Sequence, residues 1–190
     1  QLFLGMTGGA GAPKADSWMT IGHVGNAGLC FVDSIELDEL RQPIHVYERR
    51  LVKDSEGAGR HIGAPSLKVE FGPIDCNMSI GYVSDGAVNP ASGVRGGHEG
   101  GAADQWRIRC DGEIEKLDSC AQVDLLDGER IVSVSTGGGG YGAPIERDAE
   151  KVLSDVQEGW ISPERAAEIY KVSINTNSEL DREKTSALRS

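Results

Sequence analysis

The sequence TGGGGYGAPIERDAEKVLSDVQEGWISPERAAEIYKV occupies residues 136–172 and contains the patterns that decide the fold. Its first part is a run of glycines, which lack a Cβ atom and let one backbone approach another closely. Its second part predicts two short helices. Asp148 can cap the first helix and Gly159 can end it, whereas Ser162 followed by Pro163 is a typical start for the second. The stretch therefore predicts a short helical pair after a glycine-rich segment.

The glycine run also invites comparison with phosphate-binding loops, in which backbone N–H groups approach an anion. A Walker loop needs lysine and then serine or threonine directly after its last glycine. Here Ala143 and Pro144 follow, and the next lysine is Lys151. A dinucleotide-binding fingerprint fits poorly too, because the predicted helix begins several residues late and no early βαβ unit surrounds the run. We therefore expect a tight turn packed against a neighbouring backbone, not a nucleotide site.

Upstream of this stretch, strand patterns dominate. The β-branched and aromatic residues of IHVYERRLV predict a strand at residues 44–52, and a second strand is expected at residues 66–71. Two Asp-Gly pairs, at residues 111–112 and 127–128, each lie between apolar runs. Because Asp-Gly favours the positive φ angles of tight primed turns, each pair predicts a hairpin between the runs that flank it.

Glycines and prolines predict loops in two other places, the first two dozen residues and the segment between residues 72 and 104. Residues 175–190 form a polar tail. At this length the chain is expected to be one domain over residues 1–190. The predicted fold class is α+β: β-rich, with Gly-rich loops and hairpins, and with a short C-terminal helical pair.

Composition narrows the function classes. The chain has 26 glycines but only 5% aromatic residues, so we expect a partner surface to supply part of its stabilisation. A net charge of −11 disfavours nucleic acid and anionic membranes as partners. The chain begins with Gln1 instead of Met, so we expect a processed product, a split subunit or a piece of a longer polypeptide.

Cysteine and acidic residues suggest structural roles only. The four cysteines are far apart without a Cys-x-x-Cys pair, which predicts buried reduced thiols in a cytoplasmic protein; a bond between Cys110 and Cys120 across a hairpin is the alternative. Glu36, Asp38 and Glu39 could pair carboxylates for acid/base chemistry, but such close charges usually form a solvated face. We expect ordinary surface there.

The histidine spacing is not that of a metal site, because no two histidines could share one helix face. His23 lies in the glycine-flanked loop GHVGN, where it could contact a substrate, and His98 lies in GGHEGG, which suits a loop that lines a site. A structural, hydrogen-bonded histidine is the alternative for His23, and solvent exposure is the alternative for His98. The remaining two are His45 and His61.

Taken together, these segments resemble the C-terminal part of the hydantoinase B/oxoprolinase family, which also includes a large subunit of acetone and acetophenone carboxylases. The resemblance covers nearly the whole chain and is most specific over residues 136–172, where the glycine-rich run, a Pro-x-x-Arg-Asp segment and the helical pair follow one another. Further matches occur in the family's order: TGGAGA at 7–12, HVGN at 23–26, DSEGAGRHIG at 54–63, GVRGGHEGG at 93–101 and LDREKTSALR at 180–189.

The chain departs from the family pattern at three places. The family usually has Asp at the position of Ala143, Gly at the position of Lys171, and Arg-Gly-Gly where this chain has His61-Ile62-Gly63. These departures leave the expected fold unchanged. Because of them, the resemblance does not imply that this chain shares the substrate of a known member of the family.

The resemblance implies a division of labour between subunits. A hydantoinase A-like partner uses ATP and Mg to phosphorylate an oxygen of a lactam, imide or enolate, and the B-type subunit completes the reaction. The family's divalent metal ligands lie in the N-terminal part of the B-type subunit, which is missing here, so we assign no metal ligand to this chain. His23 and Asn26, which match the family's His-x-x-Asn, are the expected catalytic residues. His23 could exchange a proton with a ring nitrogen, and Asn26 could orient a carbonyl.

Three functional hypotheses follow. The first is a subunit of an ATP-dependent cyclic amidohydrolase that opens rings such as 5-oxoproline or hydantoin. The second is a subunit of an ATP-dependent ketone carboxylase of the acetone or acetophenone type. The third is a non-catalytic chain that scaffolds such a complex. In each case the expected partners are the A-like subunit and the N-terminal part of the B-type subunit, with a cyclic amide or a ketone as the small molecule.

Overall fold

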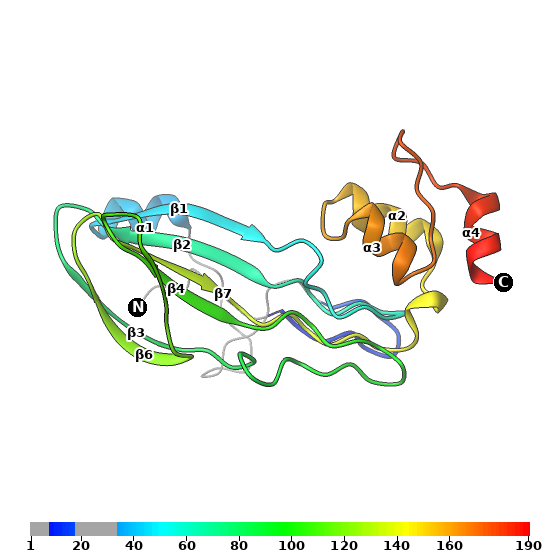
Figure 1. Cartoon of the computed structure of the whole chain (residues 1–190), viewed down its shortest axis with the longest axis horizontal. Helices are drawn as coiled ribbons and strands as arrows, with labels where there is room; N and C mark the ends of the chain where they lie inside the picture. The colour runs from blue at the N-terminus through cyan, green and yellow to red at the C-terminus, as the bar shows by residue number, and fades with distance from the viewer. Residues whose placement is uncertain (1–7, 18–33) are drawn as a thin grey trace.

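A computed structural model describes residues 8–17 and 34–190 of the chain (Figure 1). The molecule is elongated: the strands lie at one end, the C-terminal helices lie at the other, and extended segments join them. The described residues thus form an α+β fold, as the sequence predicts. In chain order the elements are α1 (Ile35–Arg41), β1 (Ile44–Leu51), β2 (Leu67–Pro73), β3 (Met78–Val83), β4 (Asp104–Ile108), β5 (Ile114–Lys116), β6 (Cys120–Leu125), β7 (Arg130–Val134), the 3-10 turn η1 (Pro144–Glu146), α2 (Ala149–Gln157), α3 (Pro163–Glu168) and α4 (Arg182–Arg189).

The strands form a five-stranded antiparallel sheet in the order β1-β2-β7-β4-β5 and a separate two-stranded sheet of β3 and β6. Side chains of β1 and β2 alternate between the two faces, as the period of two requires. Their buried members form one small apolar core, against which Ile35 of α1 and Met78 of β3 pack. That core consists of Ile44, Val46, Leu67 and Val69. The two predicted strands at 44–52 and 66–71 are confirmed.

The two hairpin predictions have different outcomes. β4 and β5 pair around Asp111-Gly112, so the first is confirmed. The second is wrong, because β6 pairs with β3 whereas β7 lies between β2 and β4. The physical reason lies in β7, where Ile131 and Val132 are both buried and need cover on both faces. The turn around Gly128 therefore passes the chain from one sheet to the other. β3 also interrupts the predicted loop between residues 72 and 104.

Four extended segments run side by side between the sheets and the helices, and we call them the glycine bundle: residues 8–12, 55–64, 91–101 and 136–142 (Figure 1). The last segment is central. Gly137 and Gly140 donate backbone hydrogen bonds to the 91–101 segment, and Gly138 and Tyr141 donate to the 55–64 segment. Gly139 accepts one from Gly11. From Gly137 to Tyr141, the neighbouring segment to which the run is hydrogen-bonded recurs every three residues, as expected for an extended chain of the polyproline II type, which has three residues per turn.

Close contact between these backbones explains the glycines. A Cβ atom on Gly138 would lie 1.9 Å from the carbonyl oxygen of Gly9, and one on Gly140 would lie 2.1 Å from that of Ala58. The predicted tight turn is therefore wrong, since the run is extended until Gly142, where φ reaches +76°. The predicted packing against a neighbouring backbone is confirmed. The predicted N-terminal loop is confirmed for residues 8–17, which contain one isolated bridge.

The C-terminal helices form as their caps predict. The Asp148 side chain accepts a hydrogen bond from the Glu150 amide at 2.8 Å, and Ser162 accepts one from the Arg165 amide at 3.1 Å. Gly159 follows α2 with a φ of +75°. The polar tail also contains α4, which the sequence analysis did not predict. Residues of α2, α3 and the following segment form a second apolar core with the bundle residues Ala58 and Ile62, and its other buried members are Val152, Ile161, Ala166, Tyr170 and Val172.

Three of the four cysteines lie among the described residues, and all three are free thiols. Cys76 is half-buried, while Cys110 and Cys120 are exposed. The prediction of buried thiols is therefore wrong for Cys110, which lies in a turn, and for Cys120, which begins β6. The alternative of a bond between these two cysteines is also wrong. Cys30 is outside the described residues.

Candidate functional site

The predicted catalytic residues His23 and Asn26 lie outside the described residues. The described chain on either side of them is anchored at two different places. Ser17 donates its amide to the Ile62 carbonyl of the glycine bundle at 2.9 Å. Ser34 caps α1 at the far end of the sheet (Figure 1). The assignment of His23 and Asn26 as catalytic residues therefore remains a prediction.

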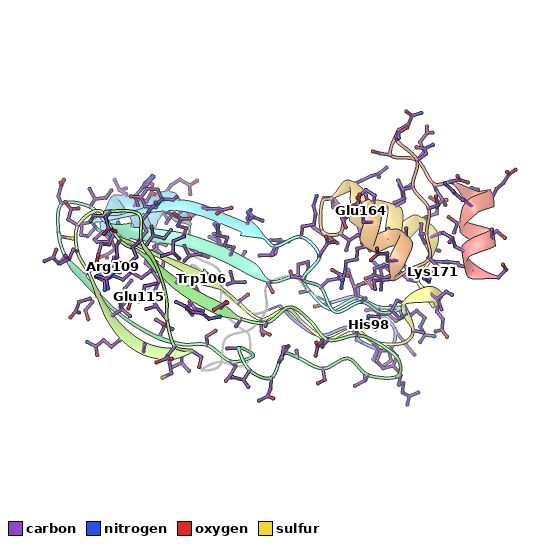
Figure 2. The ribbon with its side chains drawn as sticks, in the orientation of Figure 1. His98, Trp106, Arg109, Glu115, Glu164 and Lys171 are labelled. Carbon is purple, nitrogen blue, oxygen red and sulfur yellow. The ribbon has the colours of Figure 1, made fainter. Side chains whose placement is uncertain are left out.

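The other predicted polar residues are dispersed. His98 is exposed on the glycine bundle (Figure 2), and His45 is on the edge strand β1. Glu36 is exposed, as expected for a solvated face, but Asp38 is buried. Glu39 accepts a hydrogen bond from the Val46 amide at 2.8 Å and lies 2.9 Å from Nδ1 of His45. Asp38 is thus buried and Glu39 is hydrogen-bonded to the backbone of β1, so the expectation of ordinary surface is wrong for these two residues.

A buried ion cluster joins the glycine bundle to the helices, and its centre is Arg147, which is 2% exposed. Its Nε donates to Asp155 of α2 at 2.9 Å, and one Nη donates to Asp16 at 2.6 Å. The same Nη donates to the carbonyl oxygen of Arg60 at 3.2 Å. Lys151 adds a contact to Asp16 at 3.1 Å. The guanidinium therefore connects the bundle to α2.

Protonation of the Arg147 cluster follows from burial and charge. Burial opposes ionisation of Asp16, but Arg147 and the Ile62 amide outweigh it and lower the pKa of this carboxyl. Burial has the larger effect on Asp155, whose pKa is raised even though Arg147 opposes the rise. For Arg147, desolvation is outweighed by the two carboxylates, so its pKa is raised. The cluster is built to hold one cation between two acids.

A second buried cluster centres on Glu56 of the bundle, which is 1% exposed. Its Oε1 accepts hydrogen bonds from Arg165 Nε at 2.7 Å and from the Tyr170 hydroxyl at 2.9 Å. Burial raises the pKa of Glu56 although Arg165 opposes the rise, and burial together with Glu56 raises the pKa of Tyr170. Within residues 8–17 and 34–190, Oε2 of Glu56 has no hydrogen-bond partner.

Sequence reasoning missed both clusters. Arg147 lies in the Pro-x-x-Arg-Asp segment that carries the resemblance, so its motif was visible, but its partners Asp16 and Asp155 come from separate elements. Glu56 and Arg165 are likewise far apart in the chain, at a separation of 109 residues. In the described part of the chain, no three His, Cys, Asp or Glu side chains gather in a way that could hold a metal ion.

A third polar group surrounds Tyr141 at the end of the glycine run. The guanidinium of Arg60 lies 6.0 Å from the centre of the Tyr141 ring, and that of Arg95 lies 5.9 Å from it. The His61 ring is 6.5 Å away, and its Nδ1 is 3.7 Å from the Asp16 carboxylate. This group is more open than the two buried clusters, because Arg60 and Arg95 are exposed.

All four segments of the bundle belong to stretches that carry the resemblance, and a comparison with protein families supports the resemblance directly. Residues 1–144 match the family described as hydantoinase B/oxoprolinase. The chain belongs to this family. Its members include the caprolactamase subunit beta of Pseudomonas jessenii, to which this chain is 33% identical over 186 residues, covering 95% of this chain and 32% of the relative.

Solved structures agree with the family assignment. The ATP-dependent caprolactamase of Pseudomonas jessenii superposes with a TM-score of 0.79 and 28% identity, covering 97% of this chain and 32% of that one. Nucleotide-free acetone carboxylase has a TM-score of 0.80 at 16% identity, covering 97% and 29%, which shows a shared fold only. The chain thus spans about a third of the length of these relatives. None of the helices in the described part has the length and hydropathy needed to span a bilayer.

Proposed function

We propose that the chain is the C-terminal region of the B-type subunit of an ATP-dependent cyclic amidohydrolase, which opens rings related to 5-oxoproline, hydantoin or a lactam. The observation that carries this proposal is the 33% identity to the caprolactamase beta subunit over nearly the whole chain. The similarity to acetone carboxylase is limited to the fold, so ketone carboxylation is less well supported.

In this proposal the chemistry is divided between chains. An A-type partner binds ATP and Mg and phosphorylates an oxygen of the ring amide. The N-terminal part of the B-type subunit supplies the divalent metal. Free thiols at Cys76, Cys110 and Cys120 fit a reducing, cytoplasmic compartment.

The part proposed for this chain is to orient and protonate the ring. Water adds to the carbon that bears the phosphorylated oxygen, and His23 donates a proton to the ring nitrogen as the bond between that nitrogen and that carbon breaks. A second water then hydrolyses the resulting acyl phosphate and releases phosphate, while Asn26 donates a hydrogen bond to an oxygen on the reacting carbon. The chain leading to these residues begins at Asp16 and Ser17, which Arg147 and Ile62 hold against the bundle.

Purification of the native complex tests the reaction class. Its subunit masses should reveal an ATP-binding partner and a longer B-type polypeptide or a second B-type fragment. ATP hydrolysis should rise on addition of caprolactam, 5-oxoproline or hydantoin, without bicarbonate. ATP turnover that needs bicarbonate and a ketone would instead establish the carboxylase.

Substitution of the predicted catalytic residues tests the role of this chain. His23→Ala should lower the turnover number by about 10²–10⁴-fold while the complex stays assembled. His45→Ala, on the exposed edge strand, is the matched control and should leave turnover unchanged. A complex that dissociates when His23 is replaced would support the scaffolding role instead.

A further inference from the structure

The surface around Tyr141 has features that the proposed reaction does not use. Two guanidinium groups, from Arg60 and Arg95, lie 6.0 and 5.9 Å from the centre of one tyrosine ring. Isolated backbone bridges to His61 and Val94 hold the ring's own segment in place. The backbone therefore holds in place the ring that both cations face.

Arg95 occupies a backbone position that disfavours arginine. It is the second residue of a turn from Val94 to Gly97, closed by the Gly97 amide on the Val94 carbonyl at 3.0 Å. Its φ is +53° and that of Gly96 is +88°, which is the type I′ arrangement that favours Asn-Gly. A bulky residue that keeps such a conformation indicates a use for its side chain.

The charges of these arginines are poorly matched within the described chain. Arg60 has one carboxylate, Glu146, at 3.5 Å, and both side chains are about half exposed, so the pair is weak. Arg95 has no ion pair among residues 8–17 and 34–190. Ala143, which lies next to Gly96 of this turn, offers no charge. In a chain of net charge −11, two such arginines around one tyrosine ring are a local exception.

The shape of the surface indicates a protein partner. Val94 and Ile145 beside the arginines are 53% and 42% exposed, which adds an apolar margin to an open face. A small molecule would need a concave site, whereas tyrosine, arginine and exposed aliphatic side chains are typical of the centre of a protein interface. Guanidinium groups bind carboxylates through paired hydrogen bonds.

We propose that Arg60, Val94, Arg95, Tyr141 and Ile145, here called the Tyr141 surface, bind an acidic segment of a partner subunit. Carboxylates of the partner pair with the two guanidinium groups, and an apolar side chain packs on Val94 and Ile145. Removal of water on docking strengthens the contact of both cations with the tyrosine ring. The inference rests on the proposed assembly of this chain with another subunit, but not on the reaction that the complex performs.

The test uses the full-length subunit and its purified partner subunit, with affinity measured by calorimetry at low and high salt. Arg95→Asn should weaken association about tenfold or more and reduce its salt dependence. Asn suits the turn better than Arg, so the variant should fold at least as well as the wild type. Arg60→Gln should act in the same direction. Arg41→Gln, which removes an exposed charge on α1 at the other end of the molecule, is the matched control and should change nothing.

The outcomes separate this proposal from the proposed function. Unchanged affinity in both variants would overturn the Tyr141 surface as a docking site. Unchanged affinity with a raised KM for the small-molecule substrate would also overturn it and would assign the arginines to substrate binding. A complex that assembles through the Tyr141 surface but fails to hydrolyse any cyclic amide would contradict the proposed function alone.

Discussion

The five-stranded sheet and the glycine bundle are stabilised by different forces. In the five-stranded sheet, apolar side chains such as Val46 and Val69 are buried between the strands and α1. In the glycine bundle, the backbones themselves are in contact, with hydrogen bonds that leave the central run toward three neighbouring segments. The sheet gains stability by removing apolar surface from water, whereas the bundle has few side chains with which to do so.

This difference has a consequence for buried charges. Where side chains are few, the bundle is joined to the helices by Arg147 with Asp16 and Asp155, and by Glu56 with Arg165. Ion pairs on the sheet, such as Arg109 with Glu115, are more exposed and can be lost at little cost. The bundle is therefore expected to be sensitive both to added atoms and to lost charges. In the sheet such sensitivity is limited to a few buried positions such as Gly72 and Glu129.

Loss of the Arg147 charge should lower the stability of the fold more than any other change considered below. Arg147→Met keeps much of the side-chain volume but leaves Asp155 buried without its cation. Breaking one partner of a buried pair costs about 3–5 kcal/mol. The free energy of unfolding, measured with urea, should fall by that amount.

The matched control for Arg147 is Arg182→Met, because Arg182 pairs with Glu150 on the surface. An exposed pair contributes roughly 0–1 kcal/mol, so this variant should unfold close to the wild type. Equal losses in the two variants would show that the buried cluster does not join the bundle to the helices.

Added atoms in the glycine bundle should have the next largest effect. A Cβ on Gly138 would meet the Gly9 backbone at 1.9 Å, and a backbone atom cannot rotate away as a side chain can. Gly138→Ala should cost at least the upper end of the roughly 1–3 kcal/mol usual for overpacking. Thermal unfolding followed by circular dichroism measures the loss.

Gly81→Ala is the control for this comparison, because Gly81 lies on β3 with nothing within 4 Å of its Cβ position. Alanine should be neutral or slightly stabilising there, since it restricts the unfolded chain. If the two alanine variants have the same unfolding temperature, the bundle tolerates side chains and does not differ from the strands in this respect.

Sequence patterns predicted the parts of the fold in which side chains determine the structure. The β-branched and aromatic residues identified β1, and the caps Asp148 and Ser162 identified α2 and α3, because these patterns are local. The glycine bundle was harder to predict, since its segments are joined by backbone hydrogen bonds that leave no side-chain pattern. β7 was paired with the wrong strand for a related reason: the Asp-Gly turn is local, but the choice of sheet depends on burial.

The polar clusters could be predicted only in part. The motif that contains Arg147 was recognisable, yet its partner Asp16 comes from a segment more than a hundred residues away, and no spacing rule links them. Two of the three departures from the family pattern, which the sequence related only to substrate, have a structural meaning in the fold. Ala143 starts η1 without a side-chain cap, and Lys171 has a φ of +55°.

The pH dependence of stability should differ in sign between Glu56 of the glycine bundle and Glu129 of the sheet. Burial raises the pKa of Glu56, so the native state binds its proton more tightly than the unfolded state does. Its contribution is present below the ordinary value of 4.5 and is lost as the pH rises through the raised pKa. At the sheet end, burial of Glu129 is outweighed by the Leu126 amide and Arg107, and its pKa is lowered. Its contribution is present above 4.5 and is lost as the pH falls.

Urea unfolding of Glu56→Gln and Glu129→Gln across the acidic and neutral range tests these signs. Both variants should match the wild type at the acid end, where the native glutamates are protonated. With rising pH, Glu56→Gln should become more stable relative to the wild type, and Glu129→Gln less stable. Each slope is bounded by about 1.4 kcal/mol per pH unit. Differences that change in the same direction would show that the two environments do not differ.

The smallest change in stability is expected at Lys171, after the end of α3, where the backbone has a positive φ angle that lysine disfavours. Lys171 (Figure 2) follows the buried Tyr170 and precedes the buried Val172, so its neighbours impose its positive φ. Relief of this strain, less the added freedom of the unfolded chain, should make Lys171→Gly more stable by about 0.5–1 kcal/mol. Lys171→Ala removes the same side chain but keeps the strain, so it should gain nothing in thermal unfolding. An equal gain in the two variants would place the cost in the lysine side chain, and the backbone at this position would then be relaxed.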